Sequence, residues 1–90
     1  MSNVTDNTAS GRFELAESGQ TAFATYRHDG NSYALRHVEA PVELRGKGTA
    51  GRLMEGIVSN ARAGNFKIVP LCPYAVAWFK RHPDAADVLA

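Results

Sequence analysis

The stretch VELRGKGTAGRLMEGIVSNARAGN (Val42 to Asn65) places three glycines within six residues and then continues in a regular helical pattern. After the glycines, apolar residues recur at the spacing of one helix face: Ala50, Leu53, Met54, Ile57, Val58 and Ala61. This spacing predicts an amphipathic helix of about four turns whose apolar face packs on a sheet. The pair Gly64-Asn65 is typical of a helix C-terminus.

The residues before this stretch alternate between polar and apolar types or are rich in strand formers. We expect three strands, at Arg12 to Leu15, Thr21 to His28 and Asn31 to Ala40. Asp29-Gly30 predicts a tight hairpin between the last two, because a type I′ turn needs positive φ at both central positions. Together the three strands form an antiparallel meander.

The residues after the stretch predict one more strand and one more helix. FKIVPLC (Phe66 to Cys72) is short and mostly apolar, as a buried strand is, and a helix follows from Pro73 until Pro83 ends it. The predicted order is β-β-β-α-β-α, an α+β fold with a mostly antiparallel sheet and one parallel β-α-β crossover. Residues 1–10 are polar with nothing to bury, so we expect a disordered leader before a single domain over residues 11–90.

Composition excludes several classes of protein. A net charge of +1 without any run of lysine or arginine argues against nucleic-acid binding. No apolar run approaches the roughly 20 residues of a membrane span, and the polar N-terminus does not resemble a signal peptide. The one cysteine cannot form an internal disulfide. We therefore expect a cytoplasmic protein, monomeric or weakly dimeric through its open sheet edges.

The glycines also match two nucleotide-binding patterns, both of which fail on context. Gly46, Gly48 and Gly51 spell G-x-G-x-x-G, but four residues separate the strand from the loop, and no acidic residue ends the next strand. A Walker A loop is excluded because Gly48 stands between Lys47 and Thr49. An unliganded tight turn remains the simplest alternative.

A third pattern fits better, since Arg45, Gly48 and Ala50 spell R-x-x-G-x-A. The segment APVELRGKGTAGRLM resembles motif A of the GNAT superfamily of N-acetyltransferases. The segment FKIVPLCPYAVAWFKRHPD is similar to the very small, single-domain members of that superfamily. The resemblance extends from about Arg12 to Asp84, which is most of the chain.

The resemblance implies acetyl-CoA as co-substrate, an amine as acceptor and no metal. Val38 and Ala40 would pair with the pantetheine arm through their backbones, and the thioester would lie where the two neighbouring strands diverge. The backbone N–H groups that would hold the pyrophosphate belong to Arg45, Gly46, Lys47, Gly48, Thr49 and Ala50.

Two residues are candidates for the chemistry. His37 and Glu39 share one strand face near the expected thioester, and histidine suits proton transfer at neutral pH. Cys72 ends a strand at a helix start, where the helix dipole favours a thiolate, so it could accept the acetyl group or protonate the CoA thiolate. The alternatives are that the strand pair is merely solvated and that Cys72 is a small buried apolar residue.

Two departures from the superfamily leave the acceptor half open. Phe79 stands about where larger members carry a tyrosine that protonates the leaving thiolate. Tyr74 is the candidate substitute, with aromatic packing as the alternative. The closing hairpin that usually builds the acceptor pocket is missing from the sequence. We therefore expect an N-acetyltransferase, with a non-catalytic CoA-binding module or sensor as the alternative.

Overall fold

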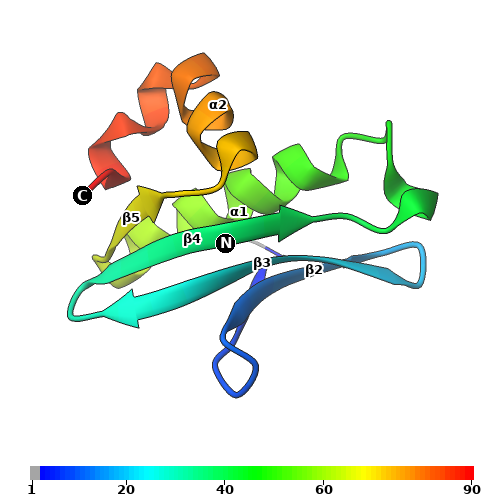
Figure 1. The fold of residues 1–90 in the computed structure, drawn as a ribbon, viewed down its shortest axis with the longest axis horizontal. Helices are drawn as coiled ribbons and strands as arrows, with labels where there is room; N and C mark the ends of the chain where they lie inside the picture. Colours follow the sequence, from blue (N-terminus) through cyan, green and yellow to red (C-terminus); the bar gives the residue numbers. More distant parts are fainter. Residues whose placement is uncertain (1–2) are drawn as a thin grey trace.

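Five strands form one mixed sheet in the computed structural model, which describes residues 3–90. The strands lie in the order β1-β2-β3-β4-β5, and the helices lie along and above them (Figure 1). The bounds are β1 Thr5–Asn7, β2 Arg12–Glu17, β3 Gln20–Asp29, β4 Ser32–Glu39, α1 Thr49–Gly64, β5 Lys67–Pro70 and α2 Pro73–Arg81, with 3-10 helices η1 at Val42–Leu44 and η2 at Pro83–Val88.

The connectivity confirms the predicted fold class. Strands β1 to β4 pair antiparallel in sequence order, while β4 and β5 pair parallel, from Ser32 opposite Lys67 to Leu35 opposite Pro70. Helix α1 is the crossover between these two strands, as parallel pairing requires. The observed sheet contains one strand more than the sequence predicts, because β1 precedes the expected meander.

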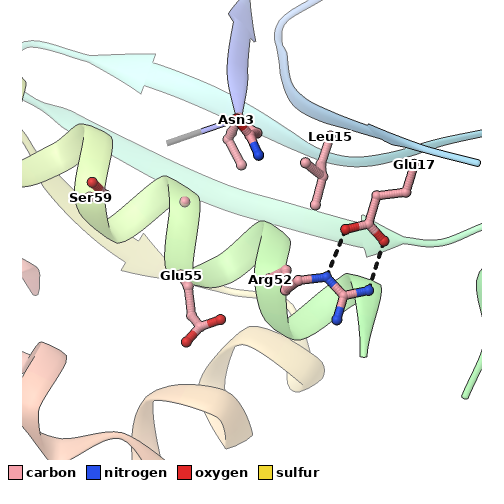
Figure 2. A pocket seen from close by; sticks show the side chains of 8 residues that line it. Asn3, Leu15, Glu17, Arg52, Glu55 and Ser59 are labelled. Atoms are coloured by element: carbon pink, nitrogen blue, oxygen red, sulfur yellow. Dashed lines mark hydrogen bonds and ion pairs between the residues drawn. The ribbon is translucent and has the colours of Figure 1, made fainter. Parts of the chain in front are cut away.

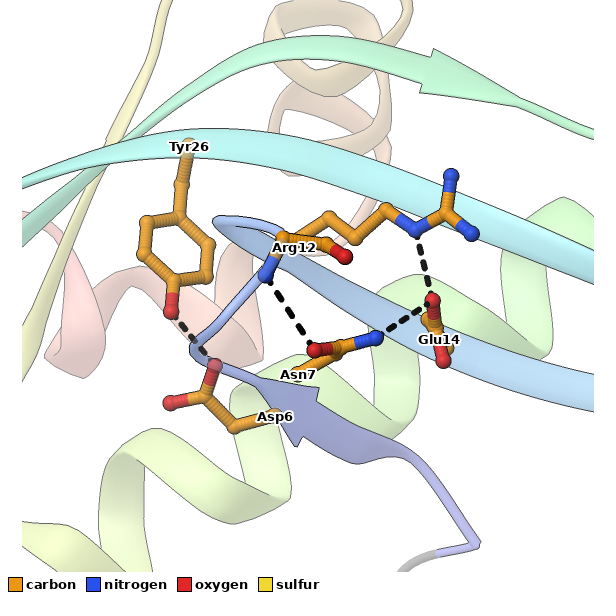
Figure 3. A network of polar contacts seen from close by, with 6 residues as sticks. Asp6, Asn7, Arg12, Glu14 and Tyr26 are labelled. Carbon is orange, nitrogen blue, oxygen red and sulfur yellow. Dashed lines mark hydrogen bonds and ion pairs between the residues drawn. The ribbon is translucent and has the colours of Figure 1, made fainter.

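The prediction of a disordered leader over residues 1–10 is wrong for the part that the structure describes; residues 1 and 2 lie outside it. Val4 is buried, and β1 pairs along β2. Polar side chains secure this short strand: the Tyr26 hydroxyl donates to Asp6 at 2.5 Å, and the Asn7 amide donates to Glu14 at 3.1 Å (Figure 3). The partners lie on β2 and β3, so the leader's own composition gives no sign of them.

The β3–β4 hairpin is also placed one residue differently from the prediction. Asp29 pairs with Ser32, so the two loop residues are Gly30 and Asn31. Gly30 has a φ of +60°, whereas Asn31 does not have a positive φ. A glycine with positive φ at the first loop position, followed by a residue with negative φ, is the pattern of a type II′ turn rather than the expected type I′.

The core lies between α1 and the inner face of the sheet. The apolar stripe of α1 is buried as predicted, with Leu53, Met54 and Ile57 fully inaccessible. They pack in one cluster with Phe13 and Leu35 of the sheet. Each such side chain stabilises the fold by about 1.5–3 kcal/mol relative to an exposed position. No helix within residues 3–90 is both long and apolar enough to cross a membrane.

Candidate functional site

The glycine-rich loop between η1 and α1 has the backbone shape that only glycine adopts easily. Gly46 and Gly48 have φ values of +77° and +76°, in the left-handed region. Gly48 is the N-cap of α1 and offers no side-chain cap to the helix. The first N–H groups of a helix have no intrahelical partner, and the helix dipole places partial positive charge there. This loop and helix start therefore form a favourable place for an anion.

A pocket of about 250 Å³ opens at this helix start. Six of its lining residues belong to the predicted cofactor site: Ala40, Arg45, Gly46, Gly48, Thr49 and Ala50. Leu44, Gly51 and Tyr74 complete the lining and were not among the predicted site residues. Lys47 is exposed and does not line the pocket. The loop and the start of α2, which are distant in sequence, thus share one cavity.

Glu17, at the end of β2, holds the first turn of α1 in place. Its carboxylate accepts a hydrogen bond from the Thr49 hydroxyl at 2.7 Å. It accepts two more from Arg52, from Nε at 2.7 Å and from Nη2 at 2.8 Å (Figure 2). The Arg52 guanidinium, and then the Thr49 hydroxyl, lower the pKa of Glu17 to about 2. Thr49 is 1% exposed, so its hydroxyl is committed to this contact. Only its backbone N–H remains for a ligand.

The Glu17–Arg52 pair also borders a second pocket of about 250 Å³, on the β1 and β2 side of α1 (Figure 2). Asn3, Leu15, Glu55 and Ser59 contribute to its lining. Glu17 and Arg52 line this cavity and do not line the one at the glycine-rich loop. Neither the contact nor the second cavity has a local sequence signal.

Strands β4 and β5 diverge beside the pocket at the glycine-rich loop. Their pairing ends at Leu35 and Pro70, and the Leu35 carbonyl then accepts hydrogen bonds from the N–H groups of Leu71 at 3.0 Å and Cys72 at 3.1 Å. Beyond this point β4 continues to Glu39, well past the end of β5, while the chain after β5 turns into α2 (Figure 1). Within the described chain, this end of β4 has a strand partner only on its β3 side.

A β-bulge in β4 determines which backbone groups face the divergence. Thr25 pairs with His37 and Tyr26 with Leu35, so Arg36 is the extra residue of β4. The backbone N–H of Tyr26 donates to the carbonyl of Gly11, on the β2 side of β3. Backbone N–H and C=O groups two residues apart in a strand point to the same side, so those of Ala24 also point toward β2. Val38, opposite Ala24, therefore makes no ladder hydrogen bonds to β3. Its N–H and C=O face the gap between β4 and β5.

His37 and Glu39 share one face of β4, as predicted, and their side chains contact each other. His37 Nε2 and Glu39 Oε1 are 3.0 Å apart, and the side chains are 57% and 52% exposed. They lie opposite Thr25 and Phe23, on the sheet face that α1 does not cover. The carboxylate fixes the orientation of the imidazole and leaves Nδ1 available to solvent or a ligand.

Cys72 lies at the divergence but belongs to the core. It is the N-cap of α2 and only 7% exposed. It does not line the pocket at the glycine-rich loop, and no hydrogen bond within residues 3–90 joins its thiol to His37. The backbone N–H of Cys72 is therefore hydrogen-bonded to the Leu35 carbonyl of β4. The two predicted catalytic residues, Cys72 and His37, are not joined directly within residues 3–90. Within residues 3–90, no group of three or more His, Cys, Asp or Glu side chains is placed so that it could bind a metal ion.

Phe79 and Tyr74, the two α2 residues considered as proton donors, have different environments. Phe79 is 7% exposed and packs edge-on against Trp78, with ring centroids 5.2 Å apart, so it is a core residue. Tyr74 lines the pocket at the glycine-rich loop, and burial raises the pKa of its hydroxyl. The Tyr74 hydroxyl therefore stays protonated at neutral pH and can donate a proton or a hydrogen bond.

Comparison with known proteins supports one family. The profile of the GCN5-related N-acetyltransferases matches residues 12–88. A solution structure of a GCN5-like protein from Staphylococcus aureus superimposes with a TM-score of 0.73 at 27% identity, covering 100% of this chain and 91% of that chain. No curated protein matches the sequence significantly. Because the family profile covers most of the chain and the fold agrees, the chain belongs to the GCN5-related N-acetyltransferase family.

Proposed function

We propose that this protein transfers an acetyl group from acetyl-CoA to an amine. The observation that carries the proposal is the N-terminus of α1, which has no side-chain cap. Together with Gly46 and Gly48, this helix start lines a pocket beside the diverging strands β4 and β5. Such a helix start stabilises a diphosphate through its N–H groups and dipole. The free edge of β4 next to it matches the extended arm of the same cofactor.

Each part of the cofactor has a counterpart in the site. The backbone N–H groups of Gly46, Gly48, Thr49 and Ala50 hold the pyrophosphate, and the Arg45 side chain adds positive charge at the pocket wall. The N–H groups of Arg45 and Lys47, which the sequence also assigned to this role, instead donate to the carbonyls of Val42 and Leu44. The exposed Lys47 contributes charge from outside the lining. The backbones of Val38 and Ala40 bind the pantetheine amides along the free edge of β4. The thioester then lies in the gap between β4 and β5.

The reaction joins the acceptor nitrogen to the acetyl carbonyl carbon and breaks the bond from that carbon to the CoA sulfur. A lysine-like ammonium must first lose a proton, which costs about 4 kcal/mol at pH 7.4. His37, held by Glu39 at 3.0 Å, is the group that accepts this proton. The backbone N–H groups at the free edge of β4 stabilise the developing oxyanion.

The departing CoA thiolate needs a proton, and two residues are positioned to supply it. Tyr74 lines the pocket and carries a protonated hydroxyl. Cys72 lies at the end of β5, and its thiol can protonate the thiolate or accept the acetyl group as a thioester before the amine does. Because Cys72 is 7% exposed, the second role requires that the gap open to admit the acetyl carbon.

The second candidate function is binding of CoA or acyl-CoA without transfer. The buried Phe79 favours it, because this residue has no hydroxyl and packs in the core where larger relatives carry the proton donor. Such a protein would sense the cofactor or present it to another protein.

Calorimetric titration with acetyl-CoA, followed by a thiol-release assay with a panel of amines, tests the proposal. Micromolar affinity and amine-dependent thiol release support acetyl transfer. Micromolar affinity without release for any amine supports the binding module. No saturation at millimolar acetyl-CoA contradicts both functions and means that the glycines only turn the chain.

A further inference from the structure

A groove of about 430 Å³ lies on the sheet face that α1 leaves uncovered. Its lining comes from three neighbouring strand segments: Arg27, Asp29, Ser32, Ala34, Val69 and Leu71. Arg27 pairs with Ala34 across β3 and β4, and Ala34 pairs with Val69 across β4 and β5, so these side chains share one face. His37 lies further along this same face, opposite Thr25.

The groove carries two opposite charges that do not neutralise each other. Arg27 and Asp29 are two residues apart on β3 and both are exposed. Within residues 3–90 neither side chain forms an ion pair or a hydrogen bond, either with the other or with a third residue. An unpaired guanidinium and an unpaired carboxylate on the β3 side of one groove match the carboxylate and ammonium of a zwitterion.

Apart from Ser32, the rest of the groove lining is apolar and leads toward the reaction site. Ala34, Val69 and Leu71 line it, and Leu71 is one of the two large apolar side chains that are exposed within residues 3–90, at 59%. Leu71 directly precedes Cys72. From the Arg27–Ala34 pair to the Thr25–His37 pair is two residues of β3, about 6.6 Å. A four-carbon chain has a comparable reach.

We propose that this groove binds the acceptor, and that the acceptor is a free α-amino acid with a terminal side-chain amine, of the lysine class. Arg27 binds its carboxylate, Asp29 binds its α-ammonium, and its methylene chain runs over Ala34 toward His37, with Val69 and Leu71 on the β5 side of the groove. The terminal amine then reaches the thioester beside His37. Its nitrogen bonds to the acetyl carbon as the bond from that carbon to the CoA sulfur breaks. The ammonium gives one proton to His37, and the CoA thiolate takes a proton from Tyr74 or Cys72, which the second proton lost by the nitrogen replaces. This assignment rests on the proposed acetyl transfer, which supplies the acetyl group.

The acceptor test compares four amines in the transfer assay. L-lysine carries both head-group charges, 1,5-diaminopentane lacks the carboxylate, Nα-acetyl-lysine lacks the α-ammonium, and Nα-acetyl-lysine N-methylamide lacks both. We expect kcat/KM for L-lysine to exceed that of the doubly blocked amine at least tenfold. Arg27→Gln and Asp29→Asn should each reduce this preference at least fivefold. Lys80→Gln, an exposed charge on α2, is the matched control and should leave it unchanged.

A binding measurement separates this assignment from the proposed function. Methyl signals of Val69 and Leu71 should shift during NMR titration with L-lysine, with or without acetyl-CoA. If acetyl-CoA does not bind but these methyls shift, acetyl transfer is wrong and the groove remains an amino-acid site. If acetyl-CoA is consumed with all four amines equally, or the methyls do not shift, acetyl transfer can stand while the groove assignment is overturned. Equal use of the doubly blocked amine would point to lysine within a polypeptide.

Discussion

Gly48 offers the most direct test of the glycine-rich loop, because its backbone and its surroundings are both defined. Its φ of +76° lies in the left-handed region, where a residue with a Cβ costs about 1–2 kcal/mol. A Cβ at this position would lie 3.2 Å from Nη1 of Arg52, the flexible end of a side chain that can move slightly. We therefore expect Gly48→Ala to lower the free energy of unfolding by about 1–2 kcal/mol, mainly through the backbone.

The effect on the cofactor is separate from the effect on stability. Gly48 lines the pocket, so a branched side chain would occupy space in the proposed pyrophosphate site. Gly48→Val should weaken acetyl-CoA binding at least about tenfold, or ~1.4 kcal/mol. Urea unfolding followed by fluorescence of the single tryptophan, Trp78, measures the stability, since this residue is 3% exposed. Calorimetry on the folded variants measures the affinity.

Gly30 provides the matched control for backbone strain. It also has a positive φ, of +60°, and a Cβ there meets nothing within 4 Å. Gly30→Ala should therefore lose a similar stability, about 1–2 kcal/mol, and keep the affinity for acetyl-CoA. A folded Gly48→Val protein with normal affinity would refute the loop assignment. A Gly48→Ala protein as stable as the parent would refute the argument from backbone strain.

Three further changes test other parts of the molecule. Cys72→Ala should leave acetyl-CoA affinity within a few-fold but reduce transfer, and unchanged turnover in the thiol-release assay would remove this residue from the mechanism. Glu17→Gln should lower stability at neutral pH. Because the folded pKa of Glu17 is depressed from 4.5 to about 2, the difference from the parent should shrink as pH falls through that window and vanish below it, in urea unfolding at several pH values. A pH-independent difference would show that the Arg52 contact does not stabilise the fold. Ile57→Ala should cost about 2–5 kcal/mol in the same unfolding assay, since the side chain is fully buried, and a loss below 1 kcal/mol would contradict its place in the core.

The fold was predictable where the determining signal is local. The stripe containing Leu53 and Ile57 has helical spacing, and Gly64-Asn65 ends the helix with Asn65 in the left-handed conformation. Strand β1 was not predictable in this way. Its three residues are polar, and its stability comes from Tyr26 and Glu14, which become neighbours only after β2 and β3 have paired.

The same distinction between local signals and contacts of distant residues applies to the candidate site. The glycine-rich loop is a continuous segment, so its residues and its backbone requirement can be read from the sequence. The contact of Glu17 with Thr49 and Arg52 joins positions 32 and 35 residues apart, and no spacing rule connects them. Tyr74 enters the pocket only because α2 starts where β5 diverges from β4.

The sequence predicts that His37 and Glu39 share one face of a strand, but it does not show which face of the sheet this is. The bulge at Arg36 is the reason. Counting alternate residues from the buried Leu35 places His37 toward α1 and Val38 toward solvent. One extra residue reverses both. His37 and Glu39 then lie on the uncovered face, in line with the groove at Arg27, while the Val38 backbone faces the gap between β4 and β5. A single irregularity thus orients the proposed acceptor side and the proposed cofactor edge of β4 together.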